Sequence, residues 1–216
     1  MCKCIVCSSN LEKIKSLGSQ PLANKYPKNI SDIENEFTSP MDVYYCEKCL
    51  YVNLPCEVSR DIFFEDYYYL SSVNKELVNH FETMAEDIDK LDSKFVLDVG
   101  SNDGILLEKL LSKNIKCLGI DPSENVTQIA NNNGLKTIVG FFDEKSVEKI
   151  KVDFGKPDLI TASSVFTHLE KPNDFFLNCK SLLCEHGKII IEVEYLANIV
   201  NDFSFERFYF DRPHYY

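Results

Sequence analysis

Residues 95–104 constrain the fold more than any other part of the chain. They open with the apolar run Phe95–Val99, whose β-branched and aromatic residues are typical of a strand buried in a parallel sheet. A loop bounded by glycines follows, and residues 105–113 then repeat apolar side chains at helical spacing. Strand, glycine loop and helix in this order predict the first unit of a nucleotide-binding α/β sheet, because glycine lets the backbone approach a ligand closely.

Acidic residues beside this loop limit the ligand. The spacing Gly100-x-x-x-Gly104 differs from the G-x-G-x-x-G of dinucleotide sites, and the carboxylates of Asp98 and Asp103 would repel a pyrophosphate. They suit a ligand with a cationic or neutral polar end, such as the amino group and sulfonium of S-adenosylmethionine (SAM). Asp121 ends the next predicted strand, where an acid accepts hydrogen bonds from ribose hydroxyls. An ordinary α/β turn with a surface aspartate is the alternative.

The second half of the chain alternates strands and helices. Such alternation predicts a parallel, doubly wound α/β sheet whose ligand lies at the carboxyl ends of the strands. Phe141 and Phe142 follow the third strand, where a ring can lie on an adenine; core packing is the alternative. His168 follows the fourth strand and is either a general base or substrate contact, or a structural residue. The strands are expected at 95–100, 116–121, 135–140, 158–163 and 188–193, and the helices at 104–113, 123–133, 144–150 and 172–183.

Composition excludes several classes of protein. A formal net charge of -11 over 216 residues argues against a nucleic-acid binder, because it provides no basic field for phosphates. No run is apolar enough to span a bilayer or to serve as a signal peptide, so we expect a cytoplasmic protein without a membrane partner. The nine cysteines are an odd number in a chain too large to need disulfides, and the clustered ones indicate metal ligands.

Two C-x-x-C pairs near the N-terminus predict a structural zinc site. Four thiolates close a tetrahedral shell and leave no position for catalysis. Cys2 and Cys56 lie nearby as alternative ligands, and a redox role for one pair is a second alternative. The prolines and polar residues between the pairs suggest irregular chain, with short strands at 42–46 and 50–54. The predicted ligands are Cys4, Cys7, Cys46 and Cys49.

A bridging segment separates this module from the α/β domain. Residues 63–72 are rich in tyrosine and serine, which offer polar groups at the edge of a cleft. Residues 74–90 repeat apolar side chains at helical spacing, and His80 beside that stripe is either structural or functional. The predicted divisions are a zinc-binding module at 1–60, the aromatic segment and helix at 61–94, and the ligand-binding domain at 95–216.

Several segments in order along the chain carry a family resemblance. They are the two cysteine pairs, Gly-Ser-Gln-Pro-Leu-Ala-Asn at 18–24, Tyr-x-Tyr-x-Ser-Ser at 67–72, Asp-Val-Gly-Ser-Asn-Asp-Gly at 98–104, Leu-Gly-Ile-Asp-Pro at 118–122 and Gly-Phe-Phe at 140–142. The chain resembles the SAM-dependent C-methyltransferases that act on nucleotide-linked keto-deoxysugars. The resemblance implies a Rossmann-like class I methyltransferase sheet joined to a small zinc-ribbon-like module.

The resemblance and the loop pattern together give the binding candidates. Tyr67, Tyr69 and Ser72 are expected near the sugar nucleotide. The residues expected to bind SAM are Asp98, Gly100, Ser101, Asn102, Gly104, Asp121, Pro122, Phe141, Phe142 and Ser163.

The sequence departs from the family after the fifth strand. It keeps Tyr209 and an acid at Asp211 but has Phe210 and Arg212 where histidines are expected, and arginine stays protonated and cannot act as a base. The catalytic candidates are therefore His168, Asp211 and Tyr209, with Arg212 as a holder of an anionic substrate. His214 is a possible substitute base.

The sequence ends at residue 216, before the family's C-terminal part, so we expect a fragment or a chain completed by a partner. The favoured function is SAM-dependent methyl transfer to a small metabolite, in particular a nucleotide-linked sugar. The alternatives are a non-catalytic or partner-dependent SAM-binding subunit and methylation of another small anionic acceptor at oxygen.

Overall fold

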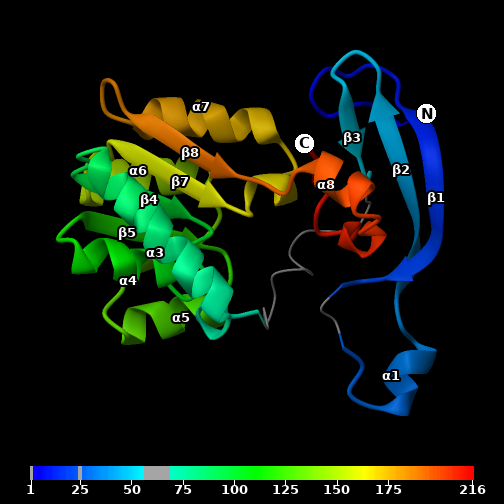
Figure 1. Ribbon diagram of the computed structural model, residues 1–216, viewed down its shortest axis with the longest axis horizontal. Coiled ribbons are helices and arrows are strands. Elements are labelled where there is room, and N and C mark those ends of the chain that lie inside the picture. The colour runs from blue at the N-terminus through cyan, green and yellow to red at the C-terminus, as the bar shows by residue number, and fades with distance from the viewer. Residues whose placement is uncertain (1, 24–25, 56–68) are drawn as a thin grey trace. The chain divides into compact units, whose positions relative to one another are not determined.

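The computed structural model describes residues 2–23, 26–55 and 69–216 and divides into two compact units. The first unit comprises the described residues of Met1–Phe63, Phe166–Pro172 and Val193–Tyr216. The second comprises those of Phe64–Val165 and Asn173–Glu192. Figure 1 shows one sheet in each unit.

A five-stranded parallel sheet forms the centre of the second unit. Its strand order is β6-β5-β4-β7-β8, so the first strand of the unit, β4, lies in the middle and the chain winds outward in both directions. This confirms the predicted Rossmann-like class I methyltransferase architecture. The strands are β4 (Phe95–Val99), β5 (Lys116–Asp121), β6 (Thr137–Val139), β7 (Leu159–Ser163) and β8 (Lys188–Glu192).

Helices cover this sheet where the apolar periodicity predicts them. The amphipathic helix α3 (Lys75–Lys90) packs on α4 (Ile105–Ser112) and shares one core cluster with it. Ile88 and Leu106 of these helices meet Val96 of β4 in that cluster, and none of the three side chains is exposed to solvent. The remaining helices are α5 (Glu124–Asn132), α6 (Glu144–Asp153) and α7 (Pro172–Leu182).

The first unit contains a four-stranded antiparallel sheet in the order β1-β2-β3-β9. Met41, Val43 and Leu54 form its core together with Phe210 and Tyr215 from the C-terminal segment. Its elements are β1 (Glu12–Pro21), α1 (Ile30–Glu34), β2 (Thr38–Cys46), β3 (Tyr51–Asn53), α8 (Leu196–Asn201) and β9 (His214–Tyr215).

The expectation of irregular chain between the cysteine pairs is wrong for the two long strands. Pro21 and Pro40 both lie in β1–β2 pairing, opposite Thr38 and Ser19. β1 is an edge strand, and β2 pairs with β3 only from residue 44 onward. Each proline therefore has one side without a partner strand, where the lack of an N–H donor costs no hydrogen bond of the sheet. The strands expected at 42–46 and 50–54 are present within β2 and β3.

The C-terminal segment contributes to the first unit. The Leu54 N–H donates to the Pro213 carbonyl at 2.9 Å, and Asn53 pairs with His214 between β3 and β9. The sequence-based divisions at 60 and 94 are linear ranges and stay predictions, whereas the compact units are discontinuous in the chain. Within the described ranges, no helix is long and apolar enough to cross a membrane.

Candidate functional site

The glycine loop after β4 holds a conformation that other residues adopt with strain. Gly100 has φ +73° and donates its N–H to the Ile120 carbonyl at 2.7 Å. A Cβ atom added at Gly100 would lie 2.1 Å from Cγ2 of Val165. Gly104, with φ +85°, begins helix α4 as its N-cap residue. The loop therefore places the N-terminus of α4, with its unpaired N–H groups, at the carboxyl edge of the sheet.

Asp121 joins this loop to the end of β5. Its Oδ2 accepts from the Asn102 N–H at 3.0 Å and its Oδ1 from the Ser123 N–H at 2.9 Å. Burial raises the pKa of this carboxyl group, and the two backbone N–H groups oppose that shift. Each carboxylate oxygen has a second lone pair, so Asp121 can bind a ligand hydroxyl while it holds the loop.

Two further carboxyl groups are buried beside the loop. Asp98 accepts from Oγ1 of Thr161 at 2.7 Å, and burial raises its pKa to about 7, with a smaller contribution from the charge of Asp121. Asp103 uses Oδ2 to accept from the Ser72 N–H, while its buried Oδ1 has no hydrogen-bond partner among the described residues. Such an oxygen suits a donor on a ligand, such as an ammonium group.

The loop also holds the segment before α3. Oδ1 of Asn102 accepts from the Ser71 N–H at 3.1 Å, and its Nδ2 donates to the Tyr69 carbonyl at 3.0 Å. With the bond from Ser72 to Asp103, three hydrogen bonds fix residues 69–72 to the glycine loop. The structure therefore brings the predicted substrate contacts Tyr69 and Ser72 to the predicted donor loop. Tyr67 lies outside the described residues.

The two phenylalanines after β6 differ in their packing. Phe142 is half-buried, with its ring 5.5 Å from the Phe175 ring, and its carbonyl accepts from Nδ2 of Asn178. Phe141 is exposed. Of the two, Phe141 has the ring surface that an adenine would need.

The other two donor-site candidates end neighbouring strands. Pro122 follows Asp121 and is half-buried. Ser163 ends β7 next to Glu192 in the parallel register, and its Oγ lies 3.6 Å from Sδ of Met84. Their roles in donor binding stay predictions.

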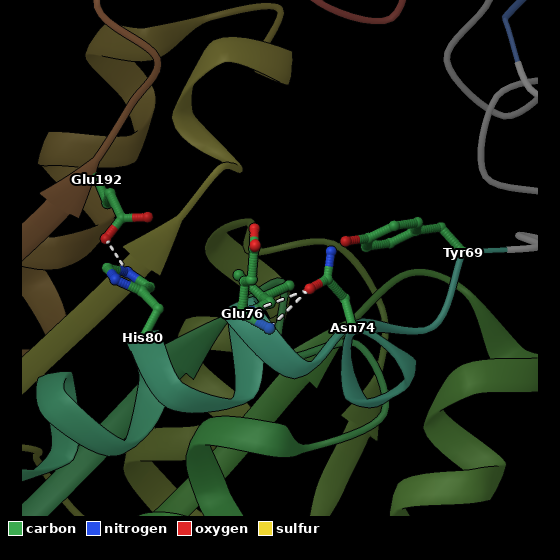
Figure 2. Close-up of a pocket in the computed structure, with 6 residues that line it drawn as sticks. Tyr69, Asn74, Glu76, His80 and Glu192 are labelled. Carbon is green, nitrogen blue, oxygen red and sulfur yellow. Dashed lines mark hydrogen bonds and ion pairs between the residues drawn. The ribbon is translucent and has the colours of Figure 1, made fainter.

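A pocket of about 330 Å³ opens above helix α3 (Figure 2). Nε2 of His80 lies 2.6 Å from Oε2 of Glu192, the last residue of β8. The volume of the pocket lies in the lower range of small-molecule binding sites. The lining residues are Tyr69, Asn74, Glu76, Leu77, His80 and Glu192.

The four predicted zinc ligands lie together in the first unit. Their Sγ atoms are all within 4.8 Å of one another, and those of Cys7 and Cys46 are 3.6 Å apart. Zn–S bonds of about 2.3 Å place the sulfurs of a tetrahedral site about 3.8 Å apart, so this set fits a structural Zn²⁺. Each pair is followed by a residue in the left-handed region, Ser8 with φ 60° and Leu50 with φ 53°. The two turns therefore share a left-handed residue directly after the second cysteine.

The predicted catalytic residues belong to the first unit. Nδ1 of His168 is hydrogen-bonded to the backbone carbonyl of Asp211 and lies 3.9 Å from Oδ2 of that residue. Burial raises the pKa of Asp211 to about 6. Arg212 forms an ion pair with Glu194 and lies over the Tyr209 ring at 4.7 Å, so its guanidinium already has a carboxylate partner.

Comparison with protein families identifies both parts of the chain. Residues 69–215 match the family model described as "Methyltransferase domain". The chain belongs to this methyltransferase family. Residues 4–64 match a model described as "Putative zinc binding domain", which begins at the first predicted ligand, Cys4. The combination of zinc module and methyltransferase predicted from the resemblance is thus confirmed.

Two curated relatives extend this result. The C-methyltransferase NovU of Streptomyces niveus is 26% identical over 219 aligned residues, which cover 99% of this chain and 52% of NovU. The ubiquinone biosynthesis O-methyltransferase of Coxiella burnetii (strain RSA 331 / Henzerling II) is 26% identical over 139 residues, covering 57% of this chain and 59% of that protein. The chain therefore spans about half the length of the curated relatives it matches.

A solved structure supports the fold of the methyltransferase domain. The PH0226 protein from Pyrococcus horikoshii OT3 aligns with a TM-score of 0.51 and 19% identity, covering 62% of each chain. At this identity the likeness concerns the fold alone.

Sequence reasoning missed part of the lining of this pocket. It left His80 open between two roles and did not single out Glu192, although both line the pocket. The strand–helix alternation places Glu192 at the carboxyl edge of the sheet, which makes it a candidate for ligand binding. Nothing in the sequence, however, indicates its contact with His80, 112 positions earlier.

Proposed function

We propose that the chain binds SAM at the carboxyl edge of β4 and β5 and transfers its methyl group to a small acceptor. The observation that carries this proposal is the cradle that Asp121 forms with the glycine loop, in a domain that matches methyltransferases over residues 69–215. SAM supplies a methyl group on a positively charged sulfur.

The residues present fit this donor. The buried carboxyl groups of Asp98, Asp103 and Asp121 give the site the acidic character that an ammonium and a sulfonium require, and the unpartnered Oδ1 of Asp103 offers an acceptor. We expect Asp121 to accept from ribose hydroxyls, and Phe141 and Phe142 are the candidates for contact with the adenine, with Phe141 favoured by its exposure. Gly100, Ser101, Asn102, Gly104, Pro122 and Ser163 would complete the donor site.

The acceptor we propose is a nucleotide-linked sugar. The support is the resemblance along almost the whole chain and the alignment with a C-methyltransferase over 99% of it. Tyr69 and Ser72, fixed to the donor loop, are the proposed contacts in the second unit. His168, Asp211 and Tyr209 remain the candidates for catalysis in the first unit. Arg212 is the weaker candidate for an anionic substrate, because Glu194 competes for its charge.

Zn²⁺ would be held by Cys4, Cys7, Cys46 and Cys49 and would stabilise the first unit. Its four protein ligands leave no open position, so the proposed methyl transfer needs no step at the metal.

Calorimetric titration of SAM into the zinc-loaded protein tests the donor site. Replacing Asp121 by alanine should weaken SAM binding about 10- to 100-fold, as expected for a lost hydrogen bond to a charged group. Asp87→Asn is the matched control, since Asp87 is exposed on α3. A wild-type protein that binds no SAM, or an Asp121→Ala variant that binds it normally, would contradict the proposal.

A further inference from the structure

The pocket above α3 lies at the same edge of the sheet as the proposed donor site. Glu192 pairs in register with Ser163 at the ends of β8 and β7, and Tyr69 is hydrogen-bonded to Asn102 of the glycine loop. Both ends of the pocket are thus tied to residues at the carboxyl ends of the strands. Figure 2 shows Tyr69 and Asn74 at one end, His80 and Glu192 at the other, and Glu76 between them.

The chemistry of the lining selects a class of ligand. Glu76 and Glu192 provide carboxylate oxygens, while Tyr69 and Asn74 provide a hydroxyl and an amide. Among the described residues that line the pocket there is no lysine or arginine, so these residues offer no partner for a phosphate or a carboxylate. A neutral ring that carries hydroxyl groups satisfies these acceptors and donors, whereas an anionic group would be repelled by the two glutamates.

Glu192 sets the tautomer of His80. An ionised carboxylate is an acceptor only, so the short contact between Oε2 of Glu192 and Nε2 of His80 puts a proton on Nε2. In the neutral imidazole, Nδ1 then keeps its lone pair, and it has no hydrogen bond within the described residues. A histidine oriented in this way by a carboxylate is suited to take up a proton.

The other three histidines are less suited to this role. His214 is 1% exposed, and His186 stands on an exposed turn before β8 with a side chain that is 91% exposed. His168 is hydrogen-bonded to a backbone carbonyl in the first unit. Of the four, His80 lines the pocket that lies in the same unit as the glycine loop.

We infer that this pocket binds the neutral, hydroxyl-bearing sugar ring of the acceptor and that His80, oriented by Glu192, is the base that removes its proton. The inference rests on the proposed methyltransferase function and deepens it. For an acceptor with a ketone, a C–H bond next to the carbonyl breaks, its proton goes to Nδ1 of His80, and its electron pair enters the enolate. The enolate carbon then forms the new bond to the methyl carbon, and the electron pair of the broken S–C bond stays on sulfur.

Proton exchange tests the base without methyl transfer. The probe is dTDP-4-keto-6-deoxyglucose in D₂O, and NMR follows the loss of the protons next to its ketone with and without protein. We expect His80→Gln and His80→Ala to slow the protein-dependent exchange about 100-fold or more and Glu192→Gln about 10-fold. His186→Gln is the matched control and should exchange at the wild-type rate. Added imidazole should restore part of the exchange rate of His80→Ala. Alanine is a suitable replacement here because it favours the helical conformation of α3.

A pH profile separates a base from a structural residue. Among the described residues, the titratable groups that line the pocket with His80 are Tyr69, Glu76 and Glu192. A general base accepts a proton only in its neutral form, so wild-type exchange should decline toward acidic pH, and the residual rate of His80→Gln should lack that decline. Exchange by both His80 variants at the wild-type rate would overturn the inference. So would a wild-type protein that binds SAM but promotes no exchange, whereas a failure of the proposed function appears separately as absent SAM binding.

Discussion

Replacing Gly100 by alanine adds one methyl group at the tightest point of the glycine loop. At φ +73° an L-residue costs about 1–2 kcal/mol relative to glycine. The new Cβ would also lie 2.1 Å from Cγ2 of Val165, and such overpacking costs about 1–3 kcal/mol. We therefore expect Gly100→Ala to lower the free energy of unfolding by about 2–5 kcal/mol.

Gly134→Ala separates the two contributions. Gly134 has a similar φ of +78°, but its added Cβ would have no described atom within 4 Å, so only the backbone cost of about 1–2 kcal/mol applies. Urea unfolding followed by circular dichroism gives both free energies under the same conditions. If Gly100→Ala is no more destabilising than Gly134→Ala, the steric argument is wrong.

A double variant adds a second check. Val165→Ala removes the methyl group that the new Cβ would strike, so Gly100→Ala combined with Val165→Ala should be about 1–3 kcal/mol more stable than the sum of the single effects. Strict additivity would mean that the loop relaxes away from Val165.

Three further changes have measurable outcomes. Cys46→Ser should abolish stoichiometric zinc binding and lower the melting temperature. The control Cys117→Ser, outside the cluster, should keep the metal. A Cys46→Ser variant that still binds one zinc ion would exclude the predicted site. Burial raises the pKa of Asp98 to about 7 in the folded state, above its unfolded value of about 3.9, so the free energy of unfolding should fall by on the order of 4 kcal/mol between pH 4 and 7. Asp98→Asn should flatten this pH dependence, as measured by urea unfolding at several pH values. An unchanged pH dependence in Asp98→Asn would contradict the assignment to Asp98. Asn74 caps α3 through the N–H groups of Glu76 and Leu77, so Asn74→Ala should cost about 1 kcal/mol of unfolding free energy and Asn74→Asp much less; equal losses would argue against the cap.

The sequence predicts the second unit well because each of its elements carries a local signal. Apolar runs mark the strands, helical periodicity marks the helices, and Gly100 and Gly104 mark the loop between them. Parallel strands with helical crossovers then allow few topologies, so the carboxyl edge and its acidic residues follow from the order of the elements. Cysteine spacing likewise identifies the metal ligands without any knowledge of the sheet.

The first unit is less predictable because its order depends on distant pairing. β1 has a largely exposed, polar face without strict alternation, and its position is fixed by partners in β2 that lie 17 to 33 residues away. The C-terminal segment pairs β9 with β3 across more than 160 residues. The contact between His80 and Glu192 is missed for the same reason, since it joins a helix and a strand that are close only in the folded chain.

The side chains of Asn102 and Asp103 connect two regions of the molecule. Their backbone belongs to the loop proposed to bind the donor, while their side chains hold the backbone of residues 69–72, and Tyr69 of that segment lines one wall of the pocket. A ligand that orders the loop therefore also orders that wall, and a second ligand then loses less conformational entropy when it binds. Thermodynamic linkage makes this effect mutual, so each ligand lowers the dissociation constant of the other by the same factor.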